Sequence, residues 1–187
     1  MKILVLSDRK SAEGNSSLLN TLLDLLMSAD HDTQTITLNR EEIHPCVGCF
    51  GCWFKTPGQC VITGDNANDI ARQEIRSDAV ILLSEVTYGG FSADIKAFLD
   101  RSIQNILPYF EIYNNEMHHE IRYECFPIWI SIGYGDINDA QASTFNRLAQ
   151  RNALNLRPRK HLTLTVRCAN DPKQAEQDIL QALEAGE

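Results

Sequence analysis

Short, continuous apolar runs recur along the chain, and they limit its fold more than any other feature of the sequence. Residues 2–6 and 79–83 read Lys-Ile-Leu-Val-Leu and Ala-Val-Ile-Leu-Leu, without alternation of polar and apolar side chains. Strands that are buried on both faces have this pattern, which is typical of parallel sheets with helices on both sides. The other strands that we expect cover residues 33–38, 126–132 and 161–166.

Segments with the apolar spacing of helices separate these strands. Asn15, Ser16 and Ser17 can cap a helix that runs to about Ser28, and its leucines form a wide apolar face. Five strands that alternate with five helices predict a doubly wound α/β fold, most commonly with strand order 2-1-3-4-5 and a ligand site at the carboxyl ends of the strands. The other expected helices cover residues 65–76, 92–103, 140–153 and 172–185.

Length and charge limit the class of protein. The 187 residues, of which 43% are hydrophobic, suffice for one sizeable core, so we expect a single domain over residues 1–187. The net charge of −8 argues against a nucleic-acid partner, which needs clustered Lys and Arg. No apolar run has the length of a membrane helix, and polar Asp8 and Arg9 follow the first strand at once, unlike a secretory leader. We therefore expect a cytoplasmic protein without a membrane partner.

Four of the six cysteines lie in one short segment. Three thiols spaced as C-x2-C-x2-C suit an iron–sulfur cluster better than zinc, whose sites usually take two C-x2-C pairs from separate hairpins. Free cysteine also behaves as a small buried hydrophobe, so the same residues can be inert or redox-responsive thiols. Both interpretations remain open for the candidate metal ligands Cys46, Cys49, Cys52 and Cys60.

Loops with particular chemistry follow three of the expected strands, over residues 7–17, 84–90 and 131–136. After the first, Arg9 and the amides at the start of a helix can bind a phosphate, although serine-rich sequences such as Ser16-Ser17 are also ordinary helix caps. This loop contains neither a dinucleotide-binding glycine fingerprint nor a Walker sequence. After the third strand, two glycines follow Tyr88, which permits close approach of the backbone to a flat ring.

These loops resemble those of the flavodoxin-like NAD(P)H-dependent FMN reductases. The family pattern Gly-Ser-x-Arg, followed by Asn-Ser at a helix start, corresponds to Leu6-Ser-Asp-Arg9 and Gly14-Asn-Ser-Ser17. Residues 87–101 are similar to the family segment Tyr-x-x-x-Ser-x-x-x-Lys-x-x-x-Asp-Arg, whose backbone lies against the flavin ring. The cysteine segment resembles that of the multimeric flavodoxin-like branch, which includes iron–sulfur flavoproteins with a [4Fe–4S] cluster. Lys96, Asp100 and Arg101 are also interpreted as charges on the surface of a helix.

The resemblance implies a flavodoxin-like fold, FMN as cofactor and NAD(P)H as hydride donor. Electrons would pass to flavin, quinone or another small acceptor in a homodimer or homotetramer, and because FMN carries the chemistry we name no catalytic side chain. It implies phosphate ligands and ring neighbours at these positions: Ser7, Arg9, Asn15, Ser16 and Ser17 for the phosphate, and Glu85, Val86, Thr87, Tyr88, Gly89, Gly133, Tyr134 and Gly135 for the ring.

Two alternatives to this enzyme stay open. The first is an electron-transfer protein in which FMN, and a [4Fe–4S] cluster at the four cysteines, relay electrons without a nicotinamide step. The second is a redox sensor or zinc site on the same scaffold. Rapid oxidation of NADH or NADPH favours the enzyme, whereas reduction only by a ferredoxin-like donor favours the carrier.

An insertion over about residues 104–124 is longer than a connection between helix and strand normally needs. The adjacent His118 and His119 would point apart in an extended segment, so they suit one metal centre poorly and are interpreted as surface or interface histidines. We expect the aromatic side chains of this segment to shape the acceptor pocket across a dimer: Tyr109, Phe110, Tyr113 and Tyr123.

Overall fold

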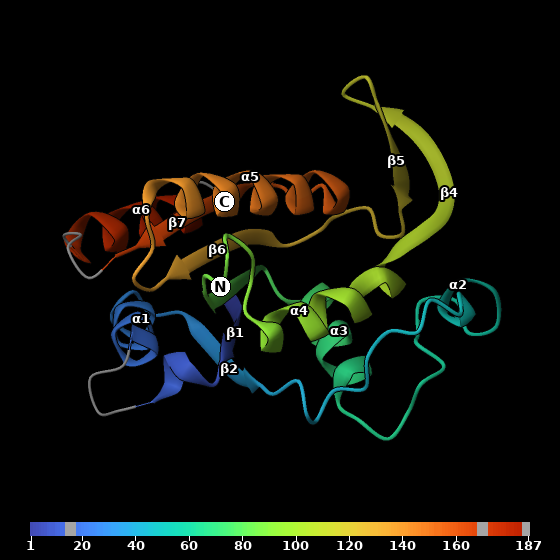
Figure 1. Ribbon diagram of the computed structural model, residues 1–187, viewed down its shortest axis with the longest axis horizontal. Coiled ribbons are helices and arrows are strands. Elements are labelled where there is room, and N and C mark those ends of the chain that lie inside the picture. The colour runs from blue at the N-terminus through green and yellow to red at the C-terminus, as the bar shows by residue number, and fades with distance from the viewer. Residues whose placement is uncertain (14–17, 168–171, 185–187) are drawn as a thin grey trace.

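A five-stranded parallel sheet forms the centre of the computed structural model, which describes residues 1–13, 18–167 and 172–184 (Figure 1). Its strands lie in the order β2-β1-β3-β6-β7, and every neighbouring pair is parallel. Counted along this sheet alone the order is 2-1-3-4-5, which confirms the predicted doubly wound fold. The strands are β1 (Lys2–Asp8), β2 (Asp32–Leu38), β3 (Ala79–Glu85), β6 (Ile128–Tyr134) and β7 (His161–Val166).

Five main helices cover the sheet, at the places where the apolar spacing predicted them. The fourth begins one residue before the expected Ala140, because Asn138 caps it: the Asn138 side chain accepts the N–H of Gln141, and the Gln141 side chain accepts the N–H of Asn138. The predicted cap at Asn15, Ser16 and Ser17 lies outside the described residues. The helices are α1 (Leu18–Ser28), α3 (Ala67–Arg76), α4 (Ala93–Arg101), α5 (Asp139–Leu156) and α6 (Pro172–Glu184), with a single turn α2 (Gly51–Phe54) and the 3₁₀ helices η1 (Lys10–Ala12) and η2 (Ser102–Asn105).

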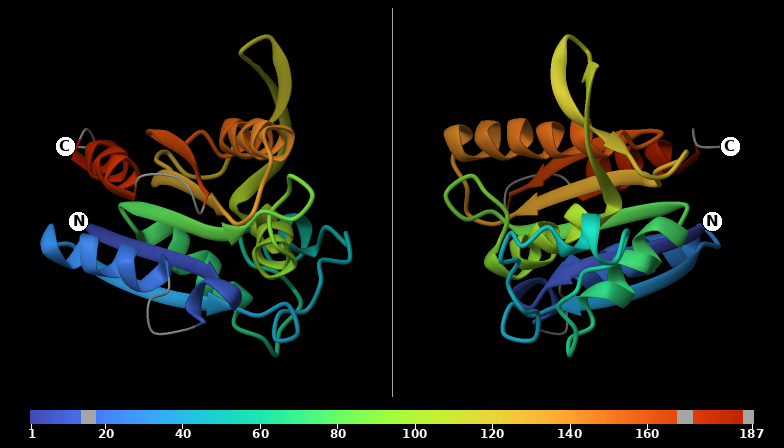
Figure 2. Two further views of the ribbon diagram at one scale, coloured as in Figure 1. Left: turned by 60° about the vertical axis from the view of Figure 1, so that its left-hand side comes forward. Right: turned by 90° about the vertical axis from the view of Figure 1, so that its right-hand side faces the viewer.

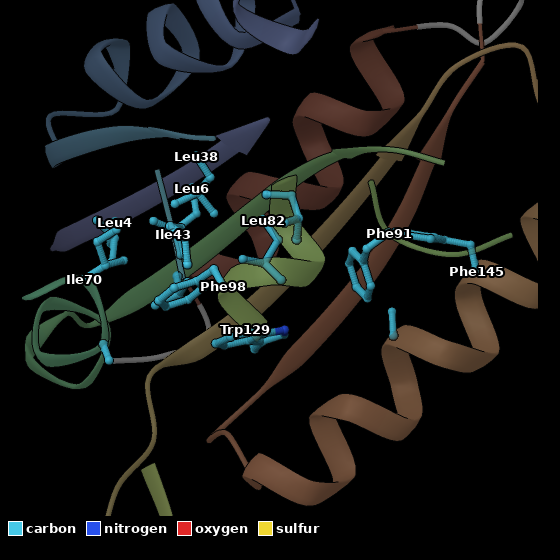
Figure 3. Close-up of a cluster of buried hydrophobic side chains, with 14 of the residues drawn as sticks. Leu4, Leu6, Leu38, Ile43, Ile70, Leu82, Phe91, Phe98, Trp129 and Phe145 are labelled. Carbon is cyan, nitrogen blue, oxygen red and sulfur yellow. The ribbon is translucent and has the colours of Figure 1, made fainter. Parts of the chain in front are cut away.

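Two apolar clusters, one on each face of the sheet, explain the continuous apolar strands. Leu4 and Leu6 of β1 pack with α3, α4 and α5 on one face, and Ile3 and Val5 pack with α1 and α6 on the other (Figure 2). Figure 3 shows the first cluster, in which Trp129 of β6 lies near Phe98 of α4. The central strands therefore carry apolar side chains at most of their positions, on both faces. No helix in the described part of the chain is long and apolar enough to cross a membrane.

The predicted insertion contains an antiparallel β-hairpin that the sequence analysis missed. Strands β4 (Ile106–Tyr113) and β5 (Glu116–Ile121) project from one edge of the molecule (Figure 1). Asn114 and Asn115 both have positive φ, as a two-residue hairpin turn requires. The β4 pattern was obscured by Pro108, which lies where the register of the two strands shifts.

A carboxyl group is buried without a cation beside the first cluster. Glu74 of α3 is fully buried, and one of its oxygens accepts a hydrogen bond of 2.6 Å from Asn105 Nδ2. The other oxygen has no hydrogen-bond partner among the described residues. Burial raises the pKa of Glu74 to about 8, although hydrogen bonds from Asn105 and Ser102 lower it in part.

This burial makes the stability of the protein pH-dependent. In the unfolded chain Glu74 loses its proton near the ordinary pKa of 4.5, whereas the folded chain keeps it until about pH 8. The folded state binds the extra proton over this interval, so the free energy of unfolding falls as pH rises through it. Because the introduced side chain of the Glu74→Gln variant does not titrate, we expect the free energy of unfolding of this variant, relative to that of the parent chain, to increase by about 3–4 kcal/mol between pH 5 and pH 8.

Urea unfolding at several pH values in this range measures the difference. Exposed Glu124, replaced in the same way, serves as the control, for which we expect no such trend. Parallel pH profiles for Glu74→Gln and the parent chain would contradict the prediction.

Candidate functional site

Asp8 joins three strand ends at the carboxyl edge of the sheet. Its buried carboxylate accepts the backbone N–H of Glu85 at 2.6 Å and the hydroxyl of Tyr134 at 2.7 Å, so it connects β1 with β3 and β6. It also accepts the backbone N–H of Ser11 at 3.0 Å. Burial and then the bond to Asp8 raise the pKa of Tyr134 well above its ordinary value, which keeps the phenol protonated as a donor.

The sequence analysis missed this role for Asp8. The available signal was a charged residue directly after a buried apolar strand, at the edge where doubly wound folds bind ligands. Asp8 lies between Ser7 and Arg9, both of which were predicted to bind a phosphate.

The described phosphate candidates contact neighbouring elements. Ser7 is buried, and its hydroxyl lies 3.2 Å from that of Thr37 on β2. Arg9 is half-exposed, and its Nε donates to Asp94 of α4 at 3.2 Å. Burial tends to raise the pKa of Asp94, but hydrogen bonds from the Arg40 backbone and Arg9 outweigh it and lower the pKa. Asn15, Ser16 and Ser17 lie outside the described residues.

The loop after β3 forms a tight turn at the same edge. Thr87 and Gly90 exchange backbone hydrogen bonds of 3.0 and 2.9 Å, and Tyr88 and Gly89 between them have positive φ. Tyr88 is 92% exposed, so its ring is open to solvent. A Cβ on Gly89 would lie 2.8 Å from Thr144 of α5, so glycine is needed there for packing as well as for conformation.

The two glycines after β6 differ in their surroundings. A Cβ on Gly133 would lie 2.6 Å from Phe145 and 2.7 Å from the side chain of Val86, so the core alone accounts for that glycine. Gly135 has φ +133°, and the nearest atoms to a Cβ there would be 3.8 Å away. Gly135 therefore leaves room for the close approach of a flat group.

These residues have the chemistry that FMN needs. Arg9 provides a cation for a phosphate, and Lys10, which is ion-paired with Glu85, provides a second. The turn at Thr87–Gly90 and the open space at Gly135 offer backbone for a flat ring system. The two cations therefore suit the phosphate end of FMN, and the open backbone suits its ring end.

The four clustered cysteines line one small cavity. Cys46 and Cys49 are exposed, Cys52 and Cys60 are buried, and none forms a disulfide. All four cysteines are among the residues that line a cavity of about 20 Å³, roughly the space of one water molecule. Burial and then the proximity of Cys60 raise the pKa of Cys52.

The cavity brings the predicted ligands together but does not preassemble a metal site. Within the described residues no three Cys, His, Asp or Glu side chains are arranged to hold a metal ion. Thiols are the donors that an iron–sulfur cluster requires. The cavity would have to widen to hold one, and two of the four candidate ligands, Cys46 and Cys49, lie on its exposed side.

A buried ion pair anchors the cysteine segment. Arg101 at the end of α4 contacts Asp65 at 2.8 Å, and both side chains are almost fully buried. The same guanidinium donates to the backbone carbonyls of His44 at 2.7 Å and Ile62 at 3.1 Å, on either side of the cysteines. Burial tends to raise the pKa of Asp65, but hydrogen bonds from Arg101 and two backbone amides lower it overall. The interpretation of Arg101 as a surface charge is therefore wrong.

A row of aromatic rings connects the cysteine segment to the hairpin. Trp53 stacks on Phe50 with a centroid distance of 5.1 Å, and His119 lies 5.0 Å from Trp53 and 4.5 Å from Phe110. His118 points elsewhere: it is buried and lies 2.8 Å from Asn155 of α5. The two histidines diverge as expected, but the interpretation of His118 as a surface residue is wrong.

Sequence comparison places these features among known proteins. The family model described as NADPH-dependent FMN reductase matches residues 1–118. An iron–sulfur flavoprotein of Methanocaldococcus jannaschii is 36% identical over 103 residues, which cover 54% of this chain and 52% of that protein. An iron–sulfur flavoprotein of Archaeoglobus fulgidus is 35% identical over 97 residues, covering 51% and 41%. The chain thus spans about half the length of these curated relatives.

Solved structures share the fold along the whole chain. A NAD(P)H:quinone oxidoreductase from Methanothermobacter marburgensis superimposes with a TM-score of 0.64 at 12% identity, covering 100% of this chain and 95% of the other. An FMN-dependent NADH-azoreductase from Bacillus anthracis, solved in complex with FMN, gives a TM-score of 0.59 at 13% identity, covering 100% and 98%. At these identities the likeness concerns the fold.

The Arg101–Asp65 pair yields a prediction about the cysteine segment. Arg101→Met leaves a buried carboxylate without its cation, so we expect the free energy of unfolding to fall by about 3–5 kcal/mol. Lys96→Met on the same helix breaks only an exposed pair with Asp100 and should change stability little. Urea unfolding measures both, and maleimide labelling should show faster modification of Cys52 and Cys60 in Arg101→Met. Equal stability of the two variants would contradict the anchoring role.

Proposed function

The chain belongs to the NADPH-dependent FMN reductase family, and from this premise we propose that it takes hydride from NADH or NADPH and reduces flavin, quinone or another small acceptor. The matched residues 1–118 include both loops with the chemistry for FMN, after β1 and after β3. The proposal rests on the arrangement at the carboxyl edge of the sheet. There Asp8 fixes the ends of three strands, next to the cations Arg9 and Lys10 and the open turn at Thr87–Gly90. NADH and NADPH remain alternatives as donors.

The proposed roles divide between the two ends of FMN. Arg9, with Ser7 and the undescribed Asn15, Ser16 and Ser17, would bind the phosphate. Glu85, Val86, Thr87, Tyr88 and Gly89 would flank the ring on one side, and Gly133, Tyr134 and Gly135 on the other. When bound, FMN supplies the redox chemistry. Asp8 acts through position: by holding the Glu85 amide and the Tyr134 hydroxyl, it fixes where both ring loops begin.

We expect protein purified without oxygen to show the absorption bands of bound oxidised flavin, which NADH or NADPH bleaches. Arg9→Ala should weaken retention of FMN several-fold, because a charge-assisted contact to phosphate is lost. Arg40→Ala is the matched control, since exposed Arg40 contacts Asp94 only through its backbone N–H. Titration of FMN into the apoprotein, followed by fluorescence quenching, measures both. Failure of the parent chain to bind FMN would refute the proposed function.

The alternative is electron transfer through FMN and a [4Fe–4S] cluster, without a nicotinamide step. The gathering of four thiols around one cavity favours it, and two relatives are iron–sulfur flavoproteins by name. Assays of iron and acid-labile sulfide on the same sample distinguish this electron carrier from the enzyme. About four irons per chain, with reduction only by a ferredoxin-like donor, would replace the enzyme with the carrier. Stoichiometric zinc without flavin would indicate the sensor.

We also propose that the chain works as a homodimer or homotetramer in which the hairpin covers a second copy. A two-stranded hairpin is marginally stable alone in water. Its exposed apolar side chains each leave roughly 100 Å² uncovered, so together they supply a large part of the about 800 Å² per partner of a standard interface. Four of them are more than 60% exposed: Tyr109, Phe110, Ile112 and Met117.

Charge placed on the hairpin should dissociate such an assembly. We expect Ile112→Glu to shift the chain toward the monomer, because burial of an unpaired carboxylate is costly. Met27→Glu, on α1 and 70% exposed, is the control and should leave the assembly unchanged. Light scattering after size exclusion gives the mass. If the hairpin also shapes the acceptor pocket, the monomeric variant should lose turnover with quinone while it retains FMN. An Ile112→Glu variant that keeps the parent's mass would refute the interface.

A further inference from the structure

A polar pocket, separate from the cavity that the four cysteines line, lies beside the cysteine segment. It occupies about 320 Å³ between α3, η2 and the turn at residues 57–59. This volume is at the lower end of the range of small-molecule sites. We call it the α3 pocket, and its walls include Gln59, Arg72, Arg76, Gln104, Asn105 and Tyr123.

Positive charge gathers at this pocket, although the whole chain has a net charge of −8. Arg72 and Arg76 are four residues apart on α3, so their side chains lie on one face of the helix and repel each other. The Arg72 side chain pairs with Asp69 at 2.7 Å, but within the described residues the side chain of Arg76 has no hydrogen bond or ion pair. Among the residues that the structure describes, no acidic one is part of the pocket walls. The Arg76 guanidinium is thus available to an anion.

A third cation lies behind the turn that forms one wall. A Cβ on Gly58 would lie 3.5 Å from Cδ of Arg122 and 3.6 Å from the Tyr123 hydroxyl. Arg122 is fixed, because it donates to the backbone carbonyls of Gln104 and Ile106 at 3.0 and 3.2 Å. It therefore adds positive potential beside the pocket without filling it.

Neutral donors complete the lining. Neither the Tyr123 hydroxyl nor the side-chain amide of Gln59 has a hydrogen-bond partner in the described ranges, so both can donate to a ligand. Gln104 and Asn105 are already engaged with Cys60 and Glu74 and form the fixed floor. Two arginines with a hydroxyl and an amide are the donor set of an oxyanion site.

We propose that the α3 pocket binds the phosphate or carboxylate group of a small molecule, with Arg72 and Arg76 as its charged contacts. The site is separate from the proposed FMN site and does not depend on it. The N-terminal end of α3 faces the carboxyl edge of the sheet, and Arg76 lies nine residues further along, about 14 Å at the helical rise.

Occupation of the pocket would also restrain the cysteine segment. Gly58 and Gln59 line the pocket, and they lie between Cys52 and Cys60 in the chain. The N–H of Cys60 is held by Asn68 and by Gln104, both of which also line the pocket. A bound oxyanion should therefore slow the modification of Cys60 by thiol reagents.

Calorimetric titration of inorganic phosphate into the FMN-saturated full chain tests the proposal, with ionic strength held constant by chloride. Added FMN keeps phosphate out of the loop after β1. We expect one saturable site, weakened at least about tenfold in Arg76→Ala and in Arg72→Ala, because each loses a charge-assisted contact. Arg147→Ala, an exposed arginine on α5 away from the pocket, should bind like the parent chain.

Absence of saturable binding, or equal affinity in the parent chain and both pocket variants, would overturn the proposal. Circular dichroism confirms folding, and the two exposed arginines provide independent variants if one disturbs α3. Competition with nicotinamide nucleotides identifies which molecule supplies the bound oxyanion. Displacement of phosphate by NADPH but not by NADH indicates the 2′-phosphate of NADPH. Displacement by neither nucleotide indicates the phosphate or carboxylate of another small molecule. FMN retention should be unchanged in Arg76→Ala, so failure here is distinct from failure of the proposed function.

Discussion

Burial of the parallel sheet on both faces is the constraint on which the rest of the structure depends. Each central strand sends side chains alternately into the cluster with α3, α4 and α5 and into the cluster with α1 and α6. Polar chemistry is therefore confined to the edges of the sheet. Asp8 shows the consequence: the first polar side chains after the apolar part of β1 appear where the strand ends, and Asp8 there joins the loops of β3 and β6.

The cysteine segment is organised differently, because it lies outside the sheet and has only a short helical turn of its own. Its order comes from side chains that reach into it. Arg101 bonds to the backbone on both sides of the cysteines, Asn68 and Gln104 hold the N–H of Cys60, and Trp53 donates to carbonyls of Ile103 and Ile106. The thiols are thus positioned by α3, α4 and η2, although they follow β2 in the chain.

The sequence predicted what depends on local pattern. Apolar runs located the five strands of the sheet, and the spacing of apolar residues located five helices. Long-range partners have no such pattern: nothing near Arg101 in the sequence indicates its pairing with Asp65, and a Gly-Tyr-Gly motif does not distinguish Gly133, which packs on Phe145, from Gly135, which leaves open space. The hairpin was missed because Pro108 interrupts β4, and because the exposed apolar residues of β4 do not alternate with polar residues as they would in a half-buried strand.

The aromatic row through Phe50, Trp53, His119 and Phe110 couples the evolution of the cysteine segment to that of the hairpin. The ring of His119 lies between Trp53 of the cysteine segment and Phe110 of β4, so a change of length or of aromatic residue in one segment would break this contact unless the other segment changed with it. Covariation between positions 53 and 119 is therefore expected among proteins that carry both segments. A chimera that receives this hairpin on a related scaffold must receive the cysteine segment with it, as one transplantable unit.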